Sequence, residues 1–199
     1  GVGIDIDKIN LIKENKIQLC EELNIPKDAI LILSVGELNA NKNHKIVIEI
    51  LPELPNNVHY LMCGDGQLKE QHERLAKKLH VSDRLHFLGY RKDVIKIMKS
   101  CDIFVFPSKR EGLSVALMEA MACGLPCVVS KIRGNEDLIE NEKGGYCVDL
   151  ENESFNIYIN KILELDLSRS MAAFNYNKVS NYSIKKVNLK MREIYERNE

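Results

Sequence analysis

The sequence from Ser100 to Ser130, SCDIFVFPSKREGLSVALMEAMACGLPCVVS, decides the fold of this chain. It opens with the apolar run Ile103–Phe106, which a Pro-Ser pair stops, and this pattern is typical of a buried parallel strand followed by a loop. A helical pattern begins near Ser114, and Gly124–Pro126 ends it before a second apolar run, Cys127–Val129. The stretch therefore predicts a strand–loop–helix–strand unit, whose first loop lies where open α/β sheets bind their ligands.

The remainder of the chain alternates in the same way between apolar runs and amphipathic segments. The apolar runs predict further strands at residues 29–35, 57–63, 84–88 and 145–148. Apolar residues at helical spacing predict helices at 8–23, 45–51, 67–80, 94–98 and 151–165. Residues 131–136 read as a polar loop, followed by a short helix before the strand at 145–148. We therefore expect a single α/β domain built on a doubly wound parallel sheet of Rossmann-like topology.

Composition excludes several classes of function. With 199 residues the chain is long enough to bury the core of one α/β domain. Its net charge of −1 gives no overall argument for nucleic acid or a membrane as partner. The six cysteines form no CxxC pair and no zinc-type cluster with His, so we expect reduced structural thiols and no metal site. We find no initiator Met, no signal peptide and no apolar run long enough to cross a bilayer.

Two carboxylates in the central stretch, Glu111 and Glu119, are separated by seven residues. Glu119 interrupts the apolar segment Leu117–Ala122, and because burial of an unpaired carboxylate is costly, we expect hydrogen-bond donors around it. The alternative is that Glu119 lies on the solvated side of an amphipathic helix. The backbone N–H groups of residues 113–115 lie at the start of this helix, where they would form a cradle for an anion.

These residues carry a resemblance to a known family. Glu111-Gly112 and Glu119-Ala120, with Gly124-Leu125-Pro126 and Ser130 behind them, resemble the donor site of the retaining family 4 glycosyltransferases. Four further patterns follow in the family's order: Ser34-Val35-Gly36 with Lys42, Gly64-Asp65-Gly66, Phe87-Leu88-Gly89-Tyr90, and Asp102 with Pro107-Ser108. The resemblance, which runs from Gly1 to about Asp149, implies the two-domain GT-B architecture. Residues 1–199 would then be the carboxyl-terminal donor-binding domain, with 151–199 as its last helices and the amino-terminal acceptor domain absent.

The resemblance also implies roles for individual residues. Glu111 and Lys42 are expected to be catalytic, with Glu111 facing the donor sugar and Lys42 binding the diphosphate as it leaves. Glu119 is expected to hold the ribose. The other residues expected to contact the donor are Gly36, Glu37, Gly64, Gly66, Tyr90, Arg91, Gly112, Leu113, Ser114 and Val115.

One position departs from the family pattern. The family usually places an Arg directly after the first glycine of this site, where Glu37 stands in this chain. A carboxylate at that position would repel a diphosphate. Either the loop is rearranged, or another cation replaces the Arg, with Arg110 and Arg133 as the candidates.

The function implied by the resemblance is transfer of a hexose from a UDP- or GDP-sugar, with retention of configuration and without a cofactor or metal. The acceptor is expected to be a polysaccharide, a capsule or a lipid-linked glycan bound by the absent domain, so that the fragment alone is inactive. No nucleic acid partner is expected. Two alternatives stay open at this point: a GT-B sugar-nucleotide epimerase, and a non-catalytic nucleotide-sugar-binding module, which Glu37 favours.

The segment from Ser168 to Arg192 contains six basic residues and no acidic one. Apolar residues such as Ile184 and Leu189 interleave with the basic ones. The pattern predicts contact with an anionic membrane or a lipid-diphosphate acceptor, or else an ordinary solvated helix face. We therefore expect a cytoplasmic protein, and we consider peripheral contact with the inner face of the membrane as an additional property.

Overall fold

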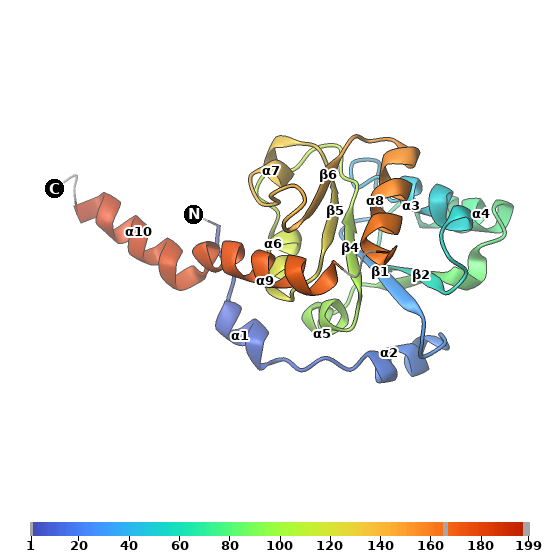
Figure 1. Cartoon of the computed structure of the whole chain (residues 1–199), viewed down its shortest axis with the longest axis horizontal. Coiled ribbons are helices and arrows are strands. Elements are labelled where there is room, and N and C mark those ends of the chain that lie inside the picture. Colours follow the sequence, from blue (N-terminus) through green and yellow to red (C-terminus); the bar gives the residue numbers. More distant parts are fainter. Residues whose placement is uncertain (1, 165–166, 197–199) are drawn as a thin grey trace.

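The computed structural model of the chain describes residues 2–164 and 167–196. In this part of the chain, six parallel strands form one sheet in the order β3-β2-β1-β4-β5-β6 (Figure 1). The strands are β1 (Ile30–Val35), β2 (Val58–Cys63), β3 (Leu85–Gly89), β4 (Ile103–Phe106), β5 (Cys127–Ser130) and β6 (Gly145–Val148). The strand order reverses between β1 and β4, so the predicted doubly wound, Rossmann-like sheet is confirmed.

Helices cover both faces of the sheet. On one face α1, α2, α5 and α6 bury their apolar residues against the strands, and on the other face α3, α4 and α8 do so (Figure 1). The helices are α1 (Ile6–Leu11), α2 (Lys16–Leu23), α3 (Lys45–Ile50), α4 (Lys69–Lys78), α5 (Val94–Lys99), α6 (Val115–Ala122), α7 (Arg133–Glu136), α8 (Asn152–Glu164), α9 (Ser168–Val179) and α10 (Ile184–Glu196). Three short 3-10 turns, η1 (Leu51–Glu53), η2 (Ser82–Arg84) and η3 (Ser180–Tyr182), complete the described elements.

Two boundaries differ from the sequence prediction. The single helix predicted at 8–23 is two helices. The first ends at Leu11, because the backbone of Ile12 is extended, and Asn15 caps the second by accepting a hydrogen bond from the backbone N–H of Gln18. The short helix predicted after residue 136 lies earlier, because α7 occupies Arg133–Glu136 within the predicted loop. The other predicted helices and strands are confirmed with ends that move by up to two residues.

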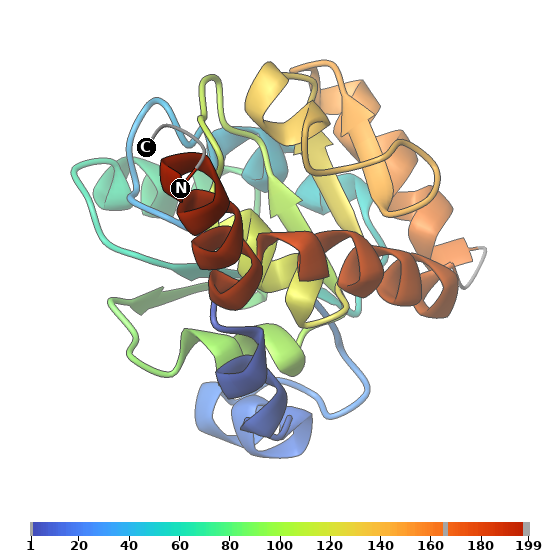
Figure 2. The ribbon, with the colours of Figure 1, turned by 90° about the vertical axis from the view of Figure 1, so that its left-hand side faces the viewer.

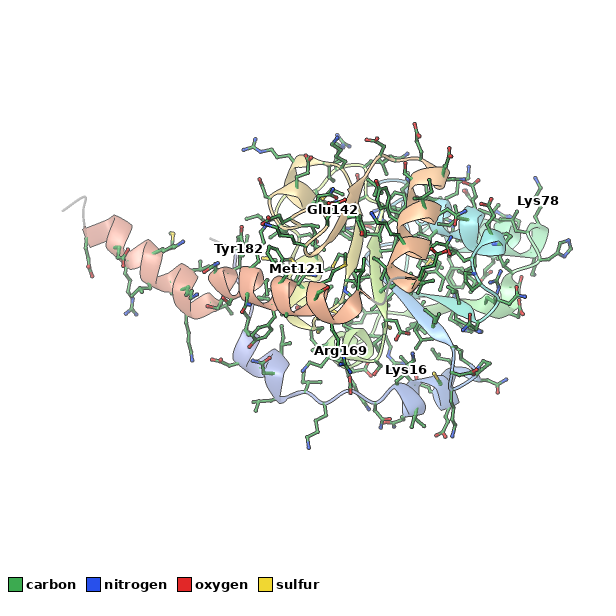
Figure 3. The ribbon with its side chains drawn as sticks, viewed as in Figure 1. Lys16, Lys78, Met121, Glu142, Arg169 and Tyr182 are labelled. Atoms are coloured by element: carbon green, nitrogen blue, oxygen red, sulfur yellow. The ribbon has the colours of Figure 1, made fainter. Side chains whose placement is uncertain are left out.

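The last two helices differ in their contact with the body of the molecule. α9 crosses α6, where the buried Met121 lies beneath it, and α10 extends away from the sheet (Figure 1, Figure 2, Figure 3). The start of the chain meets this region, because the backbone of Ile4 accepts a hydrogen bond from Ile184 and donates one to Tyr182. No helix among the described residues combines the length and apolar character needed to cross a membrane.

The interior of the sheet contains a hydrogen-bond chain that links three strands. The buried Tyr60 hydroxyl of β2 donates to the Ser34 hydroxyl of β1 at 2.8 Å, and Ser34 donates to the carbonyl of Val105 in β4 at 2.6 Å. Burial raises the pKa of the Tyr60 hydroxyl. All six cysteines are free thiols, as the sequence predicted, and burial raises the pKa of Cys63 to about 12.

Candidate functional site

The loops after β1 and β4 meet at the carboxyl ends of the two strands between which the sheet order reverses. Asn41, in the loop after β1, joins them. Its carbonyl accepts a hydrogen bond from the backbone N–H of Lys109 at 2.8 Å, and its side-chain amide donates to the carbonyl of Arg110 at 3.0 Å. A crevice at this position is the general ligand site of doubly wound sheets.

The two residues predicted to be catalytic lie in contact in this crevice. Lys42 Nζ is 2.7 Å from Glu111 Oε1, and the side chains are only 19% and 14% exposed. The same ammonium lies 4.5 Å from the ring centroid of Phe106, at the end of β4. Gly36 makes room for the Lys42 stem, because a Cβ at Gly36 would be 2.9 Å from Lys42 Cε. The free site therefore holds one positive and one negative group that neutralise each other.

The start of α6 faces the same crevice. Ser114 caps the helix by accepting a hydrogen bond from the N–H of Leu117 at 3.3 Å. Within the described residues, the N–H groups of Gly112, Leu113 and Ser114 donate no hydrogen bond, and Gly112 and Leu113 are exposed. Free N–H groups at the positive end of a helix dipole attract an anion. The N–H groups of Leu113 and Ser114, two of the three predicted for the cradle, are thus available, and anion binding there stays a prediction.

Glu119 lies in the middle of α6 and is partly buried. The expectation that hydrogen-bond donors surround it is wrong for the free protein, because its side chain has no hydrogen-bond or ion-pair partner in residues 2–164 and 167–196. Burial alone therefore raises the pKa of the Glu119 carboxyl. A half-buried carboxylate without a donor is available to a ligand that brings hydroxyl groups.

Sequence reasoning missed the support behind Glu111. Gly134, in α7, packs directly on this loop, since a Cβ there would lie 2.5 Å and 2.3 Å from the carbonyl oxygens of Glu111 and Gly112. The next residue, the fully buried Asn135, donates from Nδ2 to the carbonyl of Ser130 at 2.9 Å. Ser130 in turn donates to the carbonyl of Ser108 at 2.5 Å. Only the glycine at 134 was a visible signal, because the contact joins segments that are far apart in the sequence.

A pocket of about 410 Å³ opens beside the crevice, at the ends of β1, β2 and β3. It is lined by Val35, Gly36, Glu37, Cys63, Gly64, Asp65, Tyr90, Arg91 and Val94. The predicted Gly64 is part of its wall by close backbone contact, since a Cβ there would lie 2.0 Å from the carbonyl oxygen of Gly36. The predicted Gly66 lies next to the pocket and packs in the same way, since its Cβ would lie 2.6 Å from the carbonyl oxygen of Leu38. The volume is within the usual range for small-molecule sites.

Two predicted residues that line the pocket, Tyr90 and Arg91, differ in how firmly their side chains are held. Tyr90 is 85% exposed. Arg91 is held by two carboxylates: its Nε and Nη2 donate to Asp93 at 2.8 Å each, and Nη1 donates to Glu22 at 2.5 Å. These bonds, the one to Asp93 first, raise the pKa of Arg91. Its charge is thus already balanced, while the residue forms part of the pocket wall.

The position that departs from the family pattern is occupied by an exposed carboxylate. Glu37 Oε2 accepts a hydrogen bond from Asn39 Nδ2 at 2.9 Å. Arg110 and Arg133, the candidate replacements for the missing Arg, are both exposed, and neither forms an ion pair within the described ranges. The contacts of the free protein therefore do not select one of them.

The described residues contain no group of three or more His, Cys, Asp or Glu side chains that could hold a metal ion. The chain does have one Asp-x-Asp pair, Asp5 and Asp7, at the start of α1. Asp5 caps α1 by accepting from the N–H of Lys8, and Asp7 pairs with Lys185 of α10 at 2.6 Å. Both carboxylates thus have structural partners in the region of α1 and α10.

Together, the reversed strand order, the anion cradle and the adjoining pocket define a nucleotide-binding α/β domain. Residues 15–179 match the family model described as "Glycosyl transferases group 1". Since that match covers most of the chain, the chain belongs to the group 1 glycosyl transferases, and the family resemblance is confirmed.

Curated relatives include an *Escherichia coli* protein named UDP-Gal:alpha-D-GlcNAc-diphosphoundecaprenol alpha-1,3-galactosyltransferase, 30% identical over 203 residues, covering 97% of this chain and 52% of the relative. A *Campylobacter jejuni* protein named N-acetylgalactosamine-N,N'-diacetylbacillosaminyl-diphospho-undecaprenol 4-alpha-N-acetylgalactosaminyltransferase is 32% identical, covering 62% of this chain and 34% of the relative. Among solved structures, *Anabaena* Alr3699/HepE in complex with UDP and glucose superposes with a TM-score of 0.88 at 25% identity, covering 98% of this chain and 55% of that one. The chain thus spans about half the length, or less, of these proteins.

Proposed function

We propose that this chain is the donor-binding half of a retaining glycosyltransferase that uses a UDP- or GDP-sugar. The observation that carries the proposal is the Lys42–Glu111 pair, which lies at the anion cradle of α6 in the crevice between β1 and β4. A cation for phosphate and a carboxylate for sugar hydroxyls stand side by side there. The relatives named as glycosyltransferases support transfer over epimerisation or binding alone.

The donor would bind across the crevice. The pocket beside Tyr90 and Arg91 takes the base, and Glu119 accepts hydrogen bonds from the ribose hydroxyls. Lys42 and the N–H groups of residues 112–115 hold the diphosphate. UDP in the structure of *Anabaena* Alr3699/HepE supports a nucleotide in this fold.

Donor binding would divide the ion pair of the free site. Lys42 moves to the diphosphate, and Glu111 accepts hydrogen bonds from the donor sugar. Lys42 and the helix N–H groups then stabilise the charge on the leaving diphosphate without a metal ion. The acceptor hydroxyl oxygen bonds to the anomeric carbon on the face from which the diphosphate departs, and the hydroxyl proton passes to a phosphate oxygen. Attack and departure on the same face preserve the anomeric configuration.

The acceptor would be a polysaccharide, a capsule or a lipid-linked glycan held by an amino-terminal domain outside residues 1–199. The chain spans about half of its relatives' length, and one relative is named for a diphosphoundecaprenol acceptor. The isolated chain should therefore bind a donor but transfer no sugar. Transfer of sugar by residues 1–199 alone would contradict the proposal that a separate domain binds the acceptor.

The central test is titration of the chain with a nucleoside, its diphosphate and its diphosphate sugar, followed by calorimetry. Lys42→Ala should weaken nucleoside diphosphate binding about tenfold to hundredfold and leave nucleoside binding unchanged, because a charge-assisted contact with phosphate is lost. Lys45→Ala is the matched control, since that lysine pairs with Glu49 on the exposed side of α3. Equal diphosphate affinity in Lys42→Ala and the parent chain would contradict the proposed site.

We further propose peripheral membrane contact through residues 168–192. The four basic residues of α10 in this segment, Lys185, Lys186, Lys190 and Arg192, are exposed, and so is the apolar Leu189. Exposed Lys and Arg attract anionic lipid, and each contributes on the order of 1 kcal/mol near the surface. The chain should sediment with phosphatidylserine-containing vesicles at low salt and remain free with phosphatidylcholine vesicles. Equal sedimentation with both, or with neither, would contradict this contact.

A further inference from the structure

The loop after β1 contains an apparent contradiction. It carries Lys42, the cation of the proposed diphosphate site, and five positions earlier an exposed carboxylate, Glu37. A carboxylate near a diphosphate opposes binding by Coulomb repulsion. The contacts of Glu37 show what it does for the loop.

Glu37 makes one side-chain contact that defines the orientation of its neighbour. Its Oε2 accepts a hydrogen bond from Asn39 Nδ2 at 2.9 Å, and the backbone N–H of Asn39 donates to the Glu37 carbonyl at 2.9 Å. An ionised carboxylate can only accept hydrogen bonds. Glu37 therefore fixes which end of the Asn39 amide faces it, namely the NH₂ group.

The other end of the Asn39 amide organises the backbone around Lys42. Asn39 Oδ1 accepts hydrogen bonds from the N–H groups of Asn41 and Lys42, each at 3.0 Å. Turns of this type, in which an Asn oxygen captures the N–H groups that follow it, hold a loop without regular secondary structure. A flipped amide would present NH₂ to two N–H donors and lose both bonds.

The same turn sets the distance between the two catalytic loops. The N–H of Asn41 donates to Asn39, and Asn41 in turn bonds to the backbone of Lys109 and Arg110 in the loop after β4. The N–H of Lys42 also donates to Asn39, and the Lys42 side chain contacts Glu111 in that loop at 2.7 Å. Glu37 therefore contacts Asn39, and Asn39 contacts both Asn41 and Lys42, the two residues that join the loops.

We propose that Glu37 is a positioning residue: through the side chain of Asn39, it holds the loop that carries Lys42. This inference deepens the proposed function and rests on it, because Lys42 is taken as the diphosphate ligand. In this role Glu37 acts on Lys42 through Asn39 and not by contact with the diphosphate. Its carboxylate orders the loop that presents Lys42, and this ordering outweighs the repulsion that its charge exerts.

Comparison of Glu37→Gln with Glu37→Ala separates ordering from repulsion. Both variants remove the negative charge, but only Gln keeps a side-chain oxygen that accepts from Asn39. The nucleoside diphosphate should bind about threefold to tenfold more weakly to Glu37→Ala than to Glu37→Gln, as expected for one hydrogen bond. If charge repulsion were the only effect, the two variants would bind equally and both more tightly than the parent. That result would overturn the proposal.

Asn39→Ala tests the second step. It should weaken diphosphate binding as much as Glu37→Ala does, and the double variant should be no weaker than either single one, because both changes break the same path. Additive losses would show that Glu37 acts by another route. Nucleoside binding is the internal control for Asn39→Ala, since Asn39 is not among the residues that line the pocket proposed for the base.

A measurement on the free protein keeps the inference testable apart from the proposed function. Amide hydrogen exchange of Asn41 and Lys42 should become several-fold faster in Glu37→Ala and Asn39→Ala, and stay near the parent rate in Glu37→Gln. Unchanged exchange in all three variants would overturn the positioning role. If exchange changes as expected but the parent chain binds no nucleotide, the ordering of the loop by Glu37 and Asn39 is supported and the proposed function fails.

Discussion

The two sides of the crevice are built differently. On the proposed base side, backbone packs against backbone, with Gly64 in the pocket wall and Gly66 next to it so close to the loop after β1 that no Cβ fits. On the proposed phosphate side, the Glu111 loop also packs on Gly134, but Lys42 and Glu111 contact each other through their side chains. In the part of the chain that the structure describes, the N–H groups before α6 donate no hydrogen bond. Backbone packing therefore fixes the proposed base side, whereas a ligand can replace the Lys42–Glu111 contact on the other side.

The largest effect is expected where the base side is broken. Gly64 has φ +144°, and a Cβ there would lie 2.0 Å from the Gly36 carbonyl oxygen, so Gly64→Ala should lower the free energy of unfolding by about 3 kcal/mol. For a chain of this length that corresponds to a fall in Tm of about 6–12 °C. Thermal unfolding followed by circular dichroism measures it.

Gly112→Ala, on the phosphate side, is the matched control for that change. Nothing lies within 4 Å of the position that its Cβ would occupy, so its unfolding free energy should stay within about 0.5 kcal/mol of the parent value. Equal destabilisation by the two substitutions would show that the two sides do not differ in the way described.

A smaller and opposite pair of effects should follow from the two carboxylates. Glu119→Gln should weaken nucleoside diphosphate binding by about 1–2 kcal/mol, because a charged acceptor for ribose is lost. Glu111→Gln should bind the same ligand equally or up to about fivefold more tightly, since it frees Lys42 from a partly buried ion pair. Glu111→Gln should lose only the contribution of the attached sugar. Calorimetry of both variants with the nucleoside diphosphate and with the nucleoside diphosphate sugar measures these affinities. Identical losses in the two variants would refute the separate roles of Glu119 and Glu111.

The stability of Glu119→Gln relative to the parent should depend on pH. Burial raises the pKa of the Glu119 carboxyl, so the folded state favours the protonated form and ionisation destabilises it. That cost is absent below the ordinary pKa, develops between the ordinary and the raised pKa, and is complete once the pH lies above the raised one. Urea unfolding should therefore find the variant at least as stable as the parent at pH 7. A clear loss of stability there would indicate that Glu119 is a structural residue.

Sequence reasoning predicted the fold well because the signals that define it are local. Each of the six strands is a short apolar run bounded by Gly, Pro or polar residues, and such runs can be recognised without knowing their neighbours. The break at Ile12 to Asn15 was missed because apolar residues on both sides continue a helical spacing. An Asn three residues before Gln18 was the available signal, since Asn is a preferred helix cap.

The site was predicted only as separate residues. Lys42 and Glu111 were identified by resemblance, yet their contact depends on β1 and β4 being neighbours in the sheet, which no local pattern encodes. Arg91 was predicted among the residues that contact the donor, but its ion pair with Glu22 joins residues 69 positions apart. The contacts of Asn39 and Gly134 depend on side-chain and backbone orientation, and these are fixed only by the packed structure.

The hydrogen-bond chain from Tyr60 through Ser34 to Val105 bears on the order in which the chain folds. Tyr60 and Ser34 are 26 positions apart, whereas Ser34 and Val105 are 71 apart. Closing the longer loop costs about 0.9 kcal/mol more conformational entropy, and long-range parallel pairing is slow. Strands β1 to β3 can thus assemble while β4 is still being synthesised, so the crevice that forms the proposed site would be completed late, by the docking of β4 onto the waiting edge of β1.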